Sequence, residues 1–577
     1  MSNLQKRSKM ELIKESSNGL RGNIAQELEE PTEIFSKDSV QVLKFHGMYQ
    51  CDDRDLRRER QQAGKGKAFQ FMVRIKNPGG GRLTPEQWLA VDEVSELHGD
   101  GTIRITTRQG LQFYGIGKDN LRAVIQRLDS QKLTTFGACG DGTRNVMACP
   151  ASAIRSGSAF NGQEWADKIS EKLSYTTTAY YDIWLDGEKI TQSEEPLYGD
   201  SYLPRKFKIA LADPHDNCVE ILTNDIGILP AMHDDQLEGF HVMVGGGMGA
   251  THRKAETFPR LAEPLTFVEP SQLLDTLVAI LATQRDLGNR SNRRLARMKY
   301  LVEELGIDGF RREVESRLGD LLPTTRPFPI NHGECHRGWH AQRKLGLYYY
   351  GLFVENGRIA DLPDRQLRTA LREAVKRFRP NILLTPNQDL ILSDVPAERI
   401  HLLYALLEEY GVLDESGTSR LRSHSMACPA LPTCGLAIAE AERYLPTLIT
   451  ELEQAGYGAE EVQIRMSGCP NSCSRPPVAE VGLVGKSVNA YTVFVGGSLS
   501  GARLARLLSD SVSAEELPNL IARLIDIFRS ERRDGESFGD TTHRLGPERL
   551  QEMLKAIERT QDKDERVPST AETAQLR

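Results

Sequence analysis

Two closely spaced pairs of cysteines lie between Ser425 and Arg475. The first pair stands in SMACPALPTC and the second in GCPNSC. Proline and glycine next to these cysteines prevent a regular helix, so the thiolates lie on loops that can converge on one metal centre. The donor set predicts a [4Fe-4S] cluster held by Cys428, Cys434, Cys469 and Cys473.

Three other roles fit these thiols less well. Disulfides are not expected, because the N-terminal segment MSNLQKRSKMELIKESS has no apolar signal sequence and a reducing cytosol keeps thiols free. Structural zinc usually has two to four residues within a cysteine pair, whereas five follow Cys428. Inert buried cysteines would not need the GCPNSC turn. The other cysteines are expected to be free thiols: Cys51, Cys139, Cys149, Cys218 and Cys335.

Composition limits the class of protein. A chain of 577 residues is too long for one core, so several domains are expected. Hydrophobic residues make up 39% and charged residues 27%, which is typical of a soluble protein, and no run approaches the roughly 18 apolar residues of a membrane span. The net charge of −7 argues against a nucleic-acid binder with a basic surface.

The chain carries an internal repeat. From Phe71 the pattern runs strand, helix, strand, strand, helix, with Thr84-Pro85-Glu86-Gln87 capping a helix to about His98, and this order recurs from LYYYGLFVEN. Gln109 and Gln388 are 279 residues apart, as are Cys149 and Cys428 in the two copies of MACPA. HVMVGGGMG (241–249) has a looser partner in TVFVGGSLSG (492–501). These matches predict an internally duplicated α+β fold with pseudo-two-fold symmetry.

Each copy is expected to be a ferredoxin-like half module followed by a larger α/β domain. The charged N-terminus predicts an extended, solvated arm, although the apolar and aromatic residues of KFHGMYQCDDRD suggest that part of it docks, with a partner as the candidate. The expected boundaries are 1–70 for the arm, 71–136 and 334–414 for the half modules, 137–333 for an anion-binding domain, 415–560 for the cluster domain, and 561–577 for a flexible tail.

Four basic residues stand out from the many that only hydrate the surface. Arg74 lies on a predicted strand beside apolar residues, where a charge is costly unless paired. Arg144 lies in the glycine-rich loop CGDGTRNVMACP, and Lys206 and Lys208 point to one face of a predicted strand. The half without the cysteine pairs therefore presents cations, and a two-fold arrangement would bring cations and thiols to one cavity.

These motifs resemble the signature of the sirohaem-dependent sulfite and nitrite reductases, most closely the haemoprotein subunits of NADPH-dependent assimilatory sulfite reductases. The resemblance runs from FHGMYQCDDRDLRRER to GESFGDTTHRLG. It implies a cytoplasmic enzyme that reduces sulfite to sulfide at a sirohaem coupled to the [4Fe-4S] cluster, with Cys473 as the shared ligand. The matching substrate-binding residues are Arg74, Arg144, Lys206 and Lys208. The loop 139–145 could order over the bound anion.

The same resemblance implies residues that bind the carboxylates of sirohaem: Arg104, Arg108, Gln112, and Arg297 and Lys299 on a cationic helix RSNRRLARMKY. Asn471 would tune the cluster sulfurs. GGGMGA lacks the βαβ context of a dinucleotide fold, so electrons are expected from a partner. The resemblance implies that this partner is a flavoprotein that carries FAD and FMN and binds NADPH. Two alternatives stay open, a sirohaem nitrite reductase and a non-catalytic iron–sulfur carrier or zinc-stabilised scaffold. Lys208 favours sulfite, because nitrite-reducing relatives tend to have Asn there.

Overall fold

The computed structural model describes residues 7–185, 195–413 and 418–565. It confirms the duplicated α+β fold, with one ferredoxin-like half module in each copy. The first module contains β2 (Phe69–Ile75), α5 (Pro85–His98), β3 (Ile103–Ile105), β4 (Leu111–Ile116) and α6 (Leu121–Asp129). The second contains β11 (Leu347–Leu352), α11 (Leu367–Phe378), β15 (Asn381–Leu384), β16 (Leu390–Pro396) and α12 (Ile400–Glu409). The predicted capping box is present at α5, where the Thr84 and Gln87 side chains each accept from the other's backbone N–H.

Each module forms backbone hydrogen bonds with a segment of the other module. The first sheet has the order β1-β2-β4-β3-β12, with β1 (Met48–Asp52) at one edge and β12 (Arg358–Ile359), from the second copy, at the other. The second sheet has the order β10-β11-β16-β15, beginning with β10 (Gly338–Ala341). In return, Leu83 of the first copy exchanges two backbone hydrogen bonds with Ile382 of β15. A short hairpin of β13 (Asp361–Leu362) and β14 (Arg365–Gln366) precedes α11.

The repeated glutamines lie where the copies cross. Gln109 donates to the carbonyl of Leu384 at 3.0 Å, and Gln388 donates to that of Ile105 at 3.4 Å. Both residues have a positive φ, 57° and 70°, a conformation that non-glycine residues seldom adopt. Matching strain and reciprocal bonds indicate a pseudo-two-fold axis between the modules.

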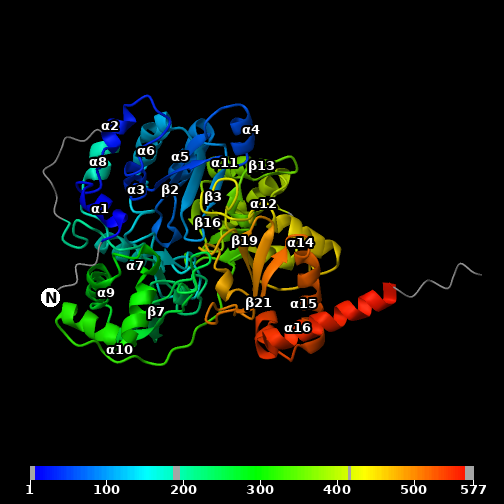
Figure 1. Cartoon of the computed structure of the whole chain (residues 1–577). Coiled ribbons are helices and arrows are strands. Elements are labelled where there is room, and N and C mark those ends of the chain that lie inside the picture. The colour runs from blue at the N-terminus through cyan, green and yellow to red at the C-terminus, as the bar shows by residue number, and fades with distance from the viewer. Residues whose placement is uncertain (1–6, 186–194, 414–417, 566–577) are drawn as a thin grey trace, which may run out of the picture.

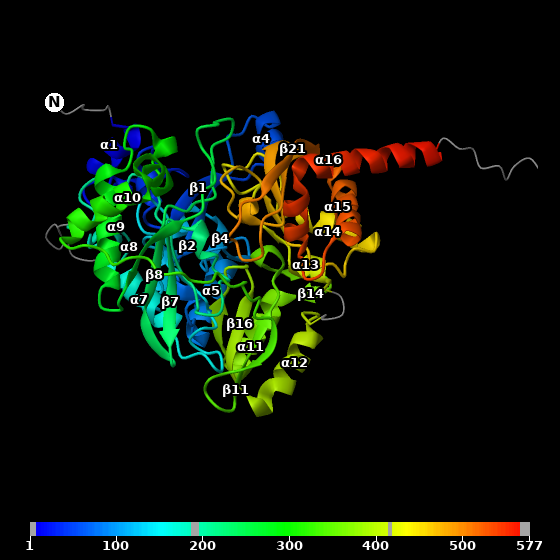
Figure 2. The same ribbon diagram turned by 90° about the horizontal axis from the view of Figure 1, so that it is seen from below.

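The larger domains repeat one sheet pattern. The first contains β5 (Met147–Ala148), β6 (Ile209–Leu211), β7 (Ile226–His233), β8 (Gln236–Val244) and β9 (Glu263–Val268), with α7 (Gly162–Lys172), α8 (Ala179–Trp184), α9 (Leu273–Leu287) and α10 (Met298–Leu318). The second contains β17 (Met426–Ala427), β18 (Ile464–Ser467), β19 (Val481–Ser487), β20 (Ala490–Val495) and β21 (Arg506–Ser513), with α13 (Arg420–Ser423), α14 (Leu445–Gln454), α15 (Leu517–Glu531) and α16 (Phe538–Glu565). In each sheet the first three strands are parallel and the rest antiparallel. The two domains lie on either side of the ferredoxin-like modules (Figures 1 and 2).

The N-terminal segment is not the solvated arm that its charge predicts. It folds into α1 (Lys9–Glu15), α2 (Ile24–Leu28), α3 (Ser39–Leu43), β1 and α4 (Arg57–Gln62), and β1 pairs antiparallel with β2. Leu20, Ile24, Leu43 and Phe45 are buried, which stabilises the segment against the first module. The prediction failed because scattered apolar residues outweigh the surrounding charge. KFHGMYQCDDRD does dock, but on its own chain. No helix in the described part of the chain has the length and apolar character needed to span a membrane.

Candidate metal and cofactor centre

The four predicted cluster cysteines sit on loops that follow neighbouring strands. Cys428 comes directly after β17, and Cys469 follows β18 after one glycine. Because β17 and β18 are parallel, their carboxyl ends lie at the same edge of the sheet and bring these two residues together. The Gly468 N–H points at the Cys428 sulfur, 3.4 Å away. A Cβ at Gly468 would lie 2.5 Å from the Ala439 carbonyl oxygen, so only glycine fits this turn.

The thiols share one electrostatic environment. Burial raises the pKa of Cys428, Cys434 and Cys469, and the adjacent Cys473 is the next cause for all three. For Cys469 the pKa rises to about 12. Asn471 donates its side-chain N–H to the Cys469 sulfur at 3.6 Å. A bound cluster would replace the protons that these thiols keep in a dry site, because iron binds the thiolate form.

Cys473 differs from the other three cysteines because it is exposed. Its backbone carbonyl accepts a hydrogen bond from the Thr107 hydroxyl at 3.0 Å, which ties it to the first half of the chain. Its thiolate raises the pKa of Lys206 and Lys208, against the larger effect of burial. The cluster cysteine that faces out of its loop is therefore the one close to the predicted substrate cations.

Arg74 and Arg144 are the other two predicted substrate-binding cations. Arg74 on β2 donates to the Gln112 side chain at 2.8 Å and to the Cys139 sulfur at 3.1 Å. Arg144 donates to the Ala138 carbonyl at 3.2 Å, while its buried Nε has no hydrogen-bond partner among the described residues. The loop 139–145 is already packed, since a Cβ at Gly142 would overlap the Tyr175 hydroxyl at 1.9 Å. Closure of this loop over an anion, as the sequence suggested, would have to displace that packing.

Lys206 and Lys208 flank the buried Phe207, as the predicted alternation requires, in an extended segment just before β6. Within the described chain neither ammonium has a hydrogen-bond or ion-pair partner, so both remain available to a ligand. Burial, together with the neighbouring Arg297 and Arg205, lowers the pKa of Lys206 to about 7. Burial, and then Lys206, lower the pKa of Lys208. Unpaired cations crowded in this way favour binding of a strongly anionic ligand.

A basic pocket of about 230 Å³ opens beside these residues. Arginine and lysine side chains from the first half face Asn471 of the cluster loop across it. Its lining is Arg205, Lys206, Gly249, Ala250, Thr251, Arg293, Arg294, Arg297, Tyr300 and Asn471. The pocket therefore joins the cation-rich half to the cysteine-rich half.

The structure places the other predicted sirohaem-binding residues in different environments. Gln112 is buried between Arg74 and the Tyr114 hydroxyl. Arg108 bonds to Asn224 and two backbone carbonyls, but its Nε is buried without a partner among the described residues. Arg104 forms an ion pair with Glu442 and donates to the Ala427 carbonyl at 3.2 Å, so in this structure it braces the strand before Cys428.

The predicted cationic helix over RSNRRLARMKY is wrong. Asn292 caps a short 3-10 turn at 293–295, and α10 begins only at Met298. The break arises because the basic side chains turn inward to partners distant in the sequence, such as Asp225, whose carboxylate lies 2.8 Å from Arg297 Nη2. Lys299 is fully buried and donates to the carbonyls of Gly247, Gly249 and Phe258. Its three donors support the glycine-rich loop next to Asn471.

Sequence reasoning missed the groups that hold the cluster loop in place. Glu220 of the first half is buried between Arg465 on β18 and Arg475 at the end of the cluster loop. Its oxygen Oε2 accepts from Arg465 Nη1 at 2.9 Å and from Arg475 Nε at 2.6 Å. From the N-terminal segment, Arg54 donates to the Ala437 carbonyl at 2.7 Å and to the Cys434 carbonyl at 3.3 Å. No local motif marks these pairs, because the partners lie hundreds of residues apart.

These residues fit both predicted groups. The gathered thiols are the donor set that an iron–sulfur cluster uses. The unpaired Lys206 and Lys208 and the orphaned Nε atoms of Arg108 and Arg144 fit a polycarboxylate such as sirohaem, which would supply the missing acceptors.

Comparison with known proteins decides the family. The model for the nitrite and sulphite reductase 4Fe-4S domain matches residues 139–322 and 425–562, and that for the nitrite/sulfite reductase ferredoxin-like half domain matches 62–131 and 340–410. The chain belongs to the nitrite and sulphite reductase family. Within this family's domains, the four cluster cysteines fall in the second 4Fe-4S match, and Arg144, Lys206 and Lys208 in the first.

Individual members of the family are similar over almost the whole chain. A protein of Anoxybacillus flavithermus named sulfite reductase [NADPH] hemoprotein beta-component is 42% identical over 548 residues, covering 93% of this chain and 95% of the relative. A protein of the same name from Staphylococcus haemolyticus is 43% identical, with the same coverage. Among solved structures, the NirA protein of Mycobacterium tuberculosis matches with a TM-score of 0.77 and 26% identity over 93% of this chain and 96% of NirA.

Proposed function

We propose that this chain is the haemoprotein component of an NADPH-dependent assimilatory sulfite reductase in the cytoplasm. It would bind sulfite and reduce it to sulfide with six electrons. One observation carries the proposal: Lys206 lines the same basic pocket as Asn471, which stands two residues before the exposed Cys473 in the cluster loop. The names of the relatives support sulfite as the substrate.

Cys428, Cys434, Cys469 and Cys473 would hold the [4Fe-4S] cluster, and Cys473 would also hold the sirohaem iron. When bound, these two groups supply the electrons that sulfite reduction requires. Arg108 and the arginines of the basic pocket would neutralise the sirohaem carboxylates, and Asn471, with its N–H directed at the Cys469 sulfur, would tune the cluster.

Arg74, Arg144, Lys206 and Lys208 would bind the substrate anion. Fixed guanidinium and ammonium groups stabilise negative charge strongly in a pocket that excludes most water. A pKa of about 7 for Lys206 would let this group hold a proton and release it near neutral pH. Each oxygen that leaves sulfite as water needs two protons, so Lys206 is suited to this supply.

The proposed partner is a flavoprotein subunit that carries FAD and FMN and passes electrons from NADPH. The relatives' names, each a beta-component, support a second component. Arg54 ties the N-terminal segment to the cluster loop, next to helix α4, which has no buried residue. A partner that docked there would lie close to the cluster cysteines.

The test is turnover with a chosen electron donor. Purified holoprotein is supplied with reduced methyl viologen and sulfite, and sulfide is measured. We expect sulfide from the artificial donor and no NADPH oxidation by this chain alone. Sulfite-dependent NADPH oxidation without a second protein would refute the partner, and the absence of sulfide from protein with full iron content would refute the activity.

A further inference from the structure

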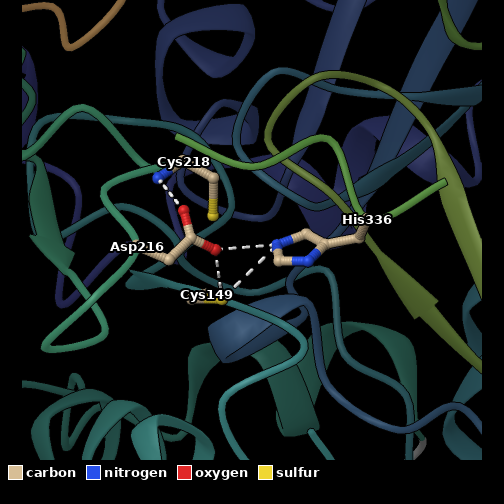
Figure 3. A group of neighbouring side chains, drawn as sticks. All are labelled: Cys149, Asp216, Cys218 and His336. Atoms are coloured by element: carbon tan, nitrogen blue, oxygen red, sulfur yellow. Dashed lines mark hydrogen bonds and ion pairs between the residues drawn. The ribbon is translucent and has the colours of Figure 1, made fainter. Parts of the chain in front are cut away.

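A second group of metal-ligating side chains lies inside the first large domain. Cys149, Asp216, Cys218 and His336 are each 3% exposed or less, and one donor atom from each lies within 4.8 Å of all the others. Figure 3 shows the four side chains converging from three separate segments of the chain. None of them belongs to the cofactor centre described above.

This group occupies the place in the first half that the cluster cysteines occupy in the second. Met147 of β5 pairs with Ala210 of β6, and Met426 of β17 pairs with Arg465 of β18. Counting from these pairs, Cys149 corresponds to Cys428, and Cys218 corresponds to Cys473. The duplication has therefore kept two thiols at equivalent positions, while Asp216 takes the place of Asn471 and His336 enters from the connection between the halves.

We propose that Cys149, Asp216, Cys218 and His336 bind one structural zinc ion. A tetrahedral zinc site with bonds of roughly 2.0–2.3 Å places its donors about 3.3–3.8 Å apart. Here Cys149 Sγ lies 3.6 Å from His336 Nε2 and 3.1 Å from Asp216 Oδ2. His336 Nε2 and Asp216 Oδ2 are 2.9 Å apart. These three distances would have to change by only a few tenths of an ångström to accommodate the ion, and the Cys218 Sγ lies within 4.8 Å of each of the three atoms. Two sulfurs, one imidazole and one carboxylate are a zinc donor set.

Backbone groups orient Asp216, and a carboxylate lies near His336. The backbone N–H groups of Cys218 and Glu334 donate to Asp216 Oδ1 at 2.8 and 3.0 Å, which leaves Oδ2 directed at the thiol and the imidazole. No described residue forms a hydrogen bond with the buried His336 Nδ1, and the Glu334 carboxylate lies 3.9 Å from it. A metal-bound histidine commonly donates its other ring N–H to a carboxylate, and Glu334 would have to move closer by several tenths of an ångström to accept that bond.

The burial of the group argues for a structural ion. Cys149, His336 and Asp216 are also the residue types of a hydrolytic nucleophile with its base and orienting acid, but Cys149 is 1% exposed and no substrate reaches it. Four protein ligands leave no position for water, which is typical of structural zinc. Because His336 lies in the connection between α10 and β10, the ion would fasten this connection to the first domain.

The experiment is metal analysis of the full-length holoprotein, produced without a histidine tag in zinc-supplemented medium. We expect one zinc per chain, beside about five irons from one [4Fe-4S] cluster and one sirohaem. Cys218→Ser and His336→Gln should lose the zinc and keep the iron. Cys335→Ser is the matched control, since this exposed thiol is adjacent to His336 but outside the group, and it should keep both metals.

X-ray absorption spectroscopy at the zinc edge, measured on the wild-type protein, keeps the test decisive if a variant fails to fold. Two sulfurs at roughly 2.3 Å with two nitrogen or oxygen ligands at roughly 2.0–2.2 Å would support the site. Four sulfurs would mean that zinc had replaced iron at Cys428, Cys434, Cys469 and Cys473, and would overturn the proposal. So would wild-type protein without zinc, or zinc retained in both folded ligand variants. Sulfite reduction is not part of this readout, so the zinc site and the proposed activity can fail separately.

Discussion

Replacing Glu220 with glutamine removes the negative charge that Arg465 and Arg475 share. Glu220 is 4% exposed, and its two partners are 2% and 7% exposed. The substituted amide could still accept a hydrogen bond, but it would leave two guanidinium groups buried without a counter-charge. Arg475 lies at the end of the cluster loop, so the substitution weakens a contact between this loop and the first half of the chain.

The pKa of Glu220 gives the size of the effect. Burial raises this pKa, but Arg465 and Arg475 outweigh burial and lower it to about 2, from an ordinary value of 4.5. The difference of about 2.5 corresponds to about 3 kcal/mol of stability. Removing one partner from a buried ion pair typically costs about 3–5 kcal/mol, which agrees. A lowered carboxyl pKa stabilises the fold above about pH 4.5, and this stabilisation is lost as the pH falls towards 2.

The assay is thermal and denaturant unfolding at pH 7, with iron content measured on the same preparations. Glu220→Gln should destabilise the protein by about 3 kcal/mol and lower its iron content. The control is Glu461→Gln, which removes a surface partner of Arg420 with exposures of 60% and 67%, and such pairs contribute about 0–1 kcal/mol. Equal losses of unfolding free energy in the two variants would refute the reasoning, because burial of the ion pair would then not determine the loss.

Three further predictions test the centre and the fold. Cys473→Ser should lose the cluster and the coupled sirohaem spectrum, and a normal spectrum with normal turnover would exclude Cys473 as the shared ligand. Lys208→Asn should keep both cofactors but lower kcat/KM for sulfite by about a hundredfold and for nitrite by less, because sulfite carries more charge; equal losses at full occupancy would contradict this. Burial lowers the pKa of His46 to about 4, from an ordinary 6.5, so the fold should lose about 3 kcal/mol as the pH falls from 6.5 to 4. His46→Gln, which can still accept from Trp184 and donate to the Leu20 carbonyl, should flatten this dependence of the melting temperature, and an unchanged slope would assign it to other groups.

Repeated local sequence made the duplicated fold predictable. Gln109 and Gln388 share a spacing with the two MACPA motifs, and the structure uses each of these glutamines to bond the other half. The cysteine pairs of the cluster domain are likewise local, since proline and glycine around them already limit the backbone. The sequence therefore predicted the architecture and the residues of the candidate centre together.

Features that depend on distant partners were not predictable. Arg297 was assigned to a cationic helix, but pairing with Asp225 places it before α10 instead. Glu220 carries no motif, and its role depends on two arginines more than 240 residues away. The sequence predicts only a free thiol at Cys218. Its match to Cys473 is not visible there, because β5 and β6 are separated by more residues than β17 and β18. This difference in length breaks the spacing of 279 and hides the match between Cys218 and Cys473.

The two equivalent sites, one at Cys218 and one at Cys473, differ in what covers them, and this difference suggests why only the second would suit the reduction of a substrate. Cys218 is 3% exposed, because the connection between the halves passes directly over it: a Cβ at Gly333 would lie 2.7 Å from the Cys218 Cα. Cys473 is exposed, its carbonyl accepts from Thr107 of the first half, and its sulfur interacts electrostatically with Lys206 and Lys208, which have no partner among the described residues. A closed site with four protein ligands, as at Cys218, suits an ion that stabilises the fold. An exposed cysteine beside cations, as at Cys473, suits a cofactor and an anion. Duplication thus supplied one geometry twice, and the connecting segment that carries His336 closed one copy.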